Sequence, residues 1–205
     1  MSKHQINDAL LNGDLVREPV GDEQGYWAGA PGWIWDDTDQ AAYICYRIRR
    51  PRGVEPDRGG ESRIAKTTDF KTFEDVWSVH KDAYESASIE KSTLRRGADG
   101  RIRYFTSYVA PEDGRWCTTF NTADTVADLN PANTQRLFTA TDLGLEGVKD
   151  PWILEENGRY CMFLSVAINT ASTSDSSHDT LDIFNTGECV SATALATSED
   201  LDEWK

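Results

Sequence analysis

One short pattern occurs three times along this chain, and the copies are sixty residues apart. In each copy a short buried strand leads through a polar turn into a second strand that is rich in aromatic residues. The strands begin just after Ala30, Glu90 and Asp150. A repeat of this length built from short strands predicts a β-propeller, in which each copy forms one four-stranded sheet. The first strands of the three sheets are expected at 31–35, 91–96 and 151–155.

The fixed period also favours the propeller over the main alternative, a two-sheet β-sandwich, because a sandwich gives no reason for a constant repeat length. We therefore predict an all-β chain with an N-terminal segment at 1–25 and a partial propeller at 26–205. Since a propeller closes with at least four blades, three copies predict a fragment of a larger ring. The blades are expected at about 26–80, 86–140 and 146–205.

The charge of the chain disfavours some partners. The 205 residues carry a net charge of −14, which disfavours nucleic acid and anionic membrane surfaces but not a neutral ligand such as a sugar. No apolar run reaches the length of a membrane span, and residues 1–20 lack the apolar core of a signal peptide. These features predict a cytoplasmic protein. They leave its oligomeric state open.

The cysteines and histidines do not indicate a metal or redox site. No Cys-x-x-Cys pair occurs, so buried free thiols are expected at the four cysteines. The three histidines show no metal-ligand spacing, and no phosphate-loop or calcium-loop pattern is present. We therefore predict no metal and no cofactor.

An arginine-rich loop stands out in this acidic chain. Antiparallel strands place the loop at 49–61 on the same face of a propeller as Glu90 and Asp150. Its arginines are candidates to clamp a carboxylate, a phosphate or sugar hydroxyl groups. The alternative is a set of local ion pairs with Glu55, Asp57 and Glu61. The substrate-binding candidates are Arg49, Arg50, Arg52, Arg58 and Lys149, with Trp27 as an aromatic platform for a sugar ring or as packing beneath the first blade.

Several short motifs resemble those of known enzymes. They are Gly-Ala-Pro at 29–31, Ser-Ile-Glu at 88–90, Lys-Asp-Pro at 149–151, and two strands that end in Thr-Thr-Asp and Ser-Glu-Asp before a tryptophan. Over residues 26–205 the chain resembles the five-bladed propeller glycoside hydrolases of the arabinanase and xylosidase group (family 43) and the invertase-like group (family 32). The stretch at 46–65 is also similar to the mannoside phosphorylases of family 130.

This resemblance implies three carboxylates around the propeller axis: a base or nucleophile, a general acid, and an aspartate that tunes the acid. Asp150 matches the Asp-Pro type of motif, and Glu90 occupies the same place one repeat earlier and could be the acid. The first repeat departs from the pattern, because Ala30 stands where an aspartate is expected. Glu61, Asp57 or a residue beyond Lys205 are the candidates to replace it, and loss of hydrolysis is the other reading.

Three functions follow from these residues. The first is a glycoside hydrolase that needs one protonated and one ionised carboxyl group. Carboxylates crowded on one axis raise one another's pKa, which would supply the protonated group. The second is a phosphate-dependent glycoside phosphorylase, in which the arginine-rich loop holds phosphate. The third, motivated by Ala30, is a carbohydrate-binding propeller without catalysis.

Overall fold

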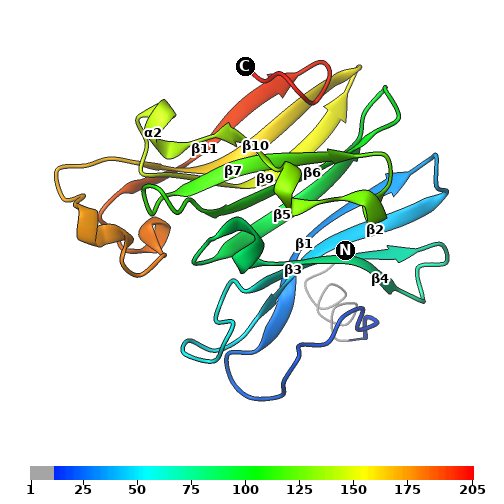
Figure 1. The fold of residues 1–205 in the computed structure, drawn as a ribbon, viewed down its shortest axis with the longest axis horizontal. Helices are drawn as coiled ribbons and strands as arrows, with labels where there is room; N and C mark the ends of the chain where they lie inside the picture. Colours follow the sequence, from blue (N-terminus) through cyan, green and yellow to red (C-terminus); the bar gives the residue numbers. More distant parts are fainter. Residues whose placement is uncertain (1–11) are drawn as a thin grey trace.

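The computed structural model describes residues 12–205, and strands dominate it (Figure 1). Each helix in this part of the chain is about one turn long, as in η1 (Lys81–Tyr84) and α2 (Ala140–Leu143). The all-β prediction is therefore confirmed. Residues 1–11 of the predicted N-terminal segment lie outside the described part. No helix within the described part has the length and apolarity that a membrane span requires.

The first third of the chain forms one four-stranded antiparallel sheet whose strands follow one another in sequence order. Alternation along β1 puts Ile34 into the core and leaves Trp33 and Trp35 on the opposite face. The strands are β1 (Trp27–Asp36), β2 (Ala41–Arg49), β3 (Glu61–Thr67) and β4 (Glu74–His80).

The rest of the chain repeats this antiparallel order, with two differences from the expected set of separate four-stranded sheets. Strands β7 and β9 pair in parallel at one position, Trp116 with Gly147, so that the second and third copies share one seven-stranded sheet. The third copy has three strands, and the backbone of Lys205 exchanges two hydrogen bonds with Thr197 along the edge of the last one. The strands are β5 (Ile89–Arg96), β6 (Ile102–Val109), β7 (Trp116–Ala123), β8 (Gln135–Phe138), β9 (Gly147–Glu156), β10 (Arg159–Ile168) and β11 (Val190–Ser198).

The sixty-residue period is visible in the backbone of the three first strands. Each of β1, β5 and β9 has a register shift, at residues 30–31, 90–91 and 150–151 respectively, where two residues face one position of the partner strand. Ala30 and Asp150 both have left-handed backbone angles there, with φ of 53° and 60°, which is uncommon for residues other than glycine. Bulges of this kind redirect side chains and are frequent beside active sites.

Apolar cores lie between the copies and bring their first strands side by side (Figure 1). One core joins Ile34 and Tyr43 of the first sheet to Leu94 and Tyr104 of the second copy. A second core joins Phe105 to side chains of the third copy such as Ile153 and Met162. Because β5 contacts both β1 and β9, the three bulges come together at one end of these strands.

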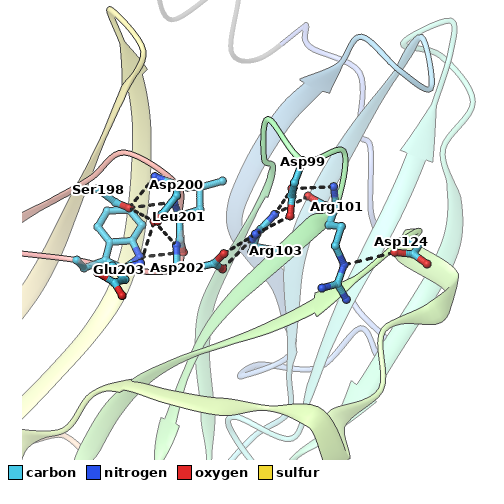
Figure 2. Close-up of polar contacts among 10 residues, drawn as sticks. Asp99, Arg101, Arg103, Asp124, Ser198, Asp200, Leu201, Asp202 and Glu203 are labelled. Carbon is cyan, nitrogen blue, oxygen red and sulfur yellow. Dashed lines mark hydrogen bonds and ion pairs between the residues drawn. The ribbon is translucent and has the colours of Figure 1, made fainter.

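Polar contacts fix the opposite end of the strands. Figure 2 shows Arg103 of β6, which is 3% exposed, between Asp99 in the β5–β6 turn and Asp202 beyond β11. Its guanidinium lies 2.5 Å from Asp99 Oδ1 and 2.6 Å from Asp202 Oδ2. Arg96 makes the corresponding link to the first sheet, at 2.8 Å from Asp36 Oδ2. Asp202 and Asp36 therefore hold neighbouring copies together, while Asp99 fixes Arg103 within the second copy.

Two turns at this end have the same construction. Thr67 and Ser198 each accept hydrogen bonds at their hydroxyl oxygens from backbone N–H groups two and three residues on. Asp69 and Asp200 do the same with their carboxylates. The hydrogen bonds from the backbone lower the pKa of Asp69 to about 2 and also lower the pKa of Asp200. These aspartates stabilise turns.

Candidate functional site

The bulged residues Glu90 and Asp150 share one cation. The ammonium nitrogen of Lys149 lies 3.5 Å from Glu90 Oε1 and 3.8 Å from Asp150 Oδ2. These two oxygens are therefore at most about 7.3 Å apart, the sum of the two distances, a separation compatible with the carboxyl pairs of glycosidases. The structure thus brings together two of the three carboxylates that the sequence singled out.

Glu90 has a second and closer cation in Arg47 of β2. Arg47 Nη1 lies 2.6 Å from Glu90 Oε2 and also donates a hydrogen bond to the carbonyl oxygen of Ile89 at 3.0 Å. The Arg47 side chain is buried, and its guanidinium lies 5.0 Å from the centre of the Trp27 ring. The Glu90 carboxylate is therefore in contact with two cations, Arg47 and Lys149.

Sequence reasoning missed Arg47. One signal was available, since Arg47 is a charged residue inside an otherwise apolar and aromatic strand at 41–48. A buried arginine requires a partner, but the sequence could not identify Glu90 of the next sheet as that partner.

Lys149 is held by aromatic rings on its other sides. Its ammonium nitrogen lies 5.0 Å from the ring centre of Trp116 and 4.7 Å from that of Phe184. Cation–π contacts of this kind favour a fixed ammonium group, and the side chain is only 12% exposed. Lys149 was predicted to bind substrate, and the structure places it between the two carboxylates.

Asp150 differs from Glu90 in its electrostatic surroundings. Burial raises the pKa of its carboxyl group, the Lys149 ammonium opposes this, and the negative charge of Glu90 adds to it. The backbone N–H of Asp150 donates to Ser107 Oγ at 3.2 Å, which helps to fix the bulge. One carboxyl group of the pair therefore contacts two cations, while the pKa of the other is raised by burial.

A cavity of about 390 Å³ opens beside Asp150. Its volume lies in the range of small-molecule sites. It extends between β9, β10, β11 and the loop that carries η5 (Ile183–Asn185). The lining residues are Lys149, Asp150, Ser165, Phe184, Asn185, Ser191, Ala192 and Thr193.

The arginines of the loop at 49–61 reach distant partners. Arg52 donates to the carbonyl oxygen of Thr180 at 3.2 Å, and Arg58 lies 4.0 Å from Asp182. Arg49 lies over the ring of Trp27 at 5.7 Å. Among the described residues, no ion pair joins Arg49, Arg50, Arg52 or Arg58 to the carboxylates once expected to neutralise them, those of Glu55, Asp57 and Glu61. The positive charge of this loop is thus not cancelled locally.

Glu61, the third catalytic candidate, belongs to a different cluster. Arg63, two residues further along β3, holds its carboxylate in two contacts of 2.7 Å and 3.1 Å. The same arginine contacts Asp75, which accepts a hydrogen bond from the hydroxyl group of Tyr46 at 2.7 Å. The structure does not bring Glu61 to Lys149. Within residues 12–205 no group of three or more His, Cys, Asp or Glu side chains could hold a metal ion.

No protein-family model matches this sequence, and no curated protein matches it significantly. Solved structures do match. A β-xylosidase, RS223, aligns with 89% of this chain at a TM-score of 0.53 and 11% identity. A family 43 β-xylosidase/α-arabinofuranosidase from a compost microbial metagenome aligns with 92% at 0.51 and 15% identity. A glycosyl hydrolase from Bacteroides ovatus aligns with 92% at 0.54 and 14% identity.

The comparison shows a shared fold. The predicted resemblance to family 43 glycoside hydrolases is confirmed at that level. This chain spans only 59% of the RS223 chain and 54% of each of the other two. The comparison therefore shows the fold of this chain and not its activity.

Proposed function

We propose that Glu90 and Asp150 form the catalytic carboxyl pair of an enzyme that cleaves glycosidic bonds. One observation carries the proposal: both residues occupy equivalent bulges on adjacent first strands and contact the ammonium group of Lys149. The shared fold with family 43 glycoside hydrolases supports the same reaction class. Glycosidic cleavage needs two such groups, one protonated and one ionised.

The surroundings of the two carboxyl groups support the following roles. Asp150, whose pKa is raised by burial, is the general acid that protonates the leaving oxygen. Glu90, ion-paired with Arg47 and Lys149, is the ionised partner that activates water or attacks the sugar. This assignment reverses the roles implied by the sequence motifs, in which Glu90 was the candidate acid.

The active protein is proposed to contain more sheets than this chain. Trp33 of β1 is 61% exposed and Leu195 of β11 is 57% exposed, and each lies with further aromatic or aliphatic side chains on an outer face of the array. Large apolar patches of this kind usually mark a contact surface. Further sheets of the same construction, closing a five-bladed propeller, would cover both faces.

Two alternative functions, phosphorolysis and carbohydrate binding without cleavage, are each favoured by one observation. Phosphate-dependent cleavage is favoured by a cluster of guanidinium groups near Glu90. These groups are close enough to affect one another, since the pKa of Arg49 is lowered by burial and by the positive charges of Arg58 and Arg47. Carbohydrate binding without cleavage is favoured by Ala30, which occupies the third equivalent bulge without a carboxylate.

The test is incubation of the complete protein with a panel of aryl glycosides that includes xylosides, arabinofuranosides and uronides, with and without inorganic phosphate. We expect release of free sugar in the absence of phosphate. Release of a sugar phosphate only in the presence of phosphate would replace hydrolysis by phosphorolysis. Saturable binding with no release in either buffer would identify a carbohydrate-binding protein and refute catalysis.

A further inference from the structure

The arginine-rich loop at 49–61 is fixed against the strand that carries Glu90. The backbone N–H of Ile89 donates to the carbonyl oxygen of Gly59 at 2.7 Å. A Cβ atom at residue 59 would lie 1.8 Å from Ser88 Oγ and 2.6 Å from the carbonyl oxygen of Ile89. Only glycine permits this approach. The loop therefore lies against the strand that carries Glu90, with the Arg58 side chain half-buried and Arg52 exposed at its edge.

A small cavity lies between this loop, Glu90 and residues 180–181. Its volume is about 30 Å³, which is enough to admit a small polar group. Three guanidinium groups line it, those of Arg47, Arg52 and Arg58, against the carboxylates of Glu90 and Asp57. The cavity is thus small, rich in positive charge, and adjacent to one of the proposed catalytic groups.

Many of the donors around this cavity are not used. A guanidinium group carries five N–H donors in a planar fork. Arg52 donates one hydrogen bond, to the carbonyl oxygen of Thr180. Arg58 forms one ion pair among the described residues, with Asp182 at 4.0 Å. The Nε atom of Arg47 is buried and has no partner among the described residues. Nearby, Arg49 adds a further positive charge and contacts the ring of Trp27.

We propose that this cavity is a subsite for a carboxylate carried by the substrate, so that the sugar bound next to Glu90 is a uronic acid. The inference rests on the proposed function and names its substrate class. A planar carboxylate accepts two parallel hydrogen bonds from a guanidinium fork. The lining carries three guanidinium groups against two carboxylates, a balance of one positive charge, which matches the single negative charge of a carboxylate better than the charge of about −2 on a phosphate group.

The experiment is calorimetric titration of the complete protein with methyl β-D-glucuronide and methyl α-D-galacturonide. The matched neutral ligands are methyl β-D-glucoside and methyl α-D-galactoside, and inorganic phosphate is the third arm. We expect at least one uronide to bind about tenfold or more tightly than its neutral match. Arg52→Gln and Arg58→Gln should each remove about tenfold or more of that affinity, the usual loss for one charge-assisted hydrogen bond.

Arg50→Gln is the control, because Arg50 belongs to the same loop but does not line the cavity. This variant should change uronide affinity by about twofold or less, as for an unpaired surface charge. Equal binding of uronides and neutral glycosides would overturn the inference, and so would binding of phosphate alone in a manner sensitive to Arg52 and Arg58.

The failure of the subsite and the failure of the proposed function give different results. If neutral glycosides are cleaved but uronides are not preferred, the function stands and the subsite is refuted. If uronides bind with the expected dependence on Arg52 and Arg58 but nothing is cleaved, the subsite stands and catalysis is refuted.

Discussion

Replacing Asp150 by asparagine is expected to lower the turnover of alkyl glycosides by about 10²-fold or more in the complete protein, the usual contribution of a general acid. The asparagine side chain has nearly the shape of aspartate, but its amide is not acidic enough to protonate a leaving oxygen. The measurement is the steady-state rate for wild type and Asp150→Asn over a range of pH. Unchanged turnover would remove Asp150 from the mechanism.

The leaving group provides the control for this variant. A dinitrophenyl glycoside departs as a stable phenolate and needs little protonation, so Asp150→Asn should retain much more of its activity on that substrate. The thermal midpoint should change little, because the Asp150 side chain is 29% exposed and lies at a cavity. A large drop in thermal stability would mean that the loss of turnover reflects the fold.

Glu90→Gln is expected to lower turnover by about 10²-fold or more on both kinds of substrate, since the group that activates water or attacks the sugar is needed whatever the leaving group. The glutamine amide carries no negative charge, so it cannot replace the Glu90 carboxylate as the partner of Arg47, at 2.6 Å, and of Lys149, at 3.5 Å. The check is the ratio of rates for alkyl and dinitrophenyl glycosides in this variant. A variant that keeps its dinitrophenyl activity would show that Glu90 is the acid after all, as the sequence motifs implied.

The sequence predicted the parts of the fold that depend on local pattern. The sixty-residue spacing of Ala30, Glu90 and Asp150 located the first strands because each copy uses the same turn and strand chemistry. It could not predict that β7 pairs with β9 at Trp116 and Gly147, since this single parallel contact depends on how two copies pack.

In the candidate site, too, contacts within one strand could be predicted from the sequence and contacts between sheets could not. Glu61 and Arg63 are two residues apart on one strand, so their side chains share a face and pair with each other. That contact could have been read from the sequence, and it weakens Glu61 as a catalytic candidate. The contact between Arg47 and Glu90 joins different sheets and could not. The blade limits at about 26–80, 86–140 and 146–205 stay predictions.

The protonation of Asp150 can be measured directly by carbon NMR of its carboxyl group as a function of pH. We expect a midpoint above the ordinary aspartate value of about 3.9, because burial raises the pKa of Asp150. Lys149→Met should raise the midpoint further by removing the opposing ammonium charge, and Glu90→Gln should lower it by removing a neighbouring negative charge. A midpoint at or below the ordinary value, unmoved by either substitution, would contradict an acid and base pair built from Asp150 and Glu90.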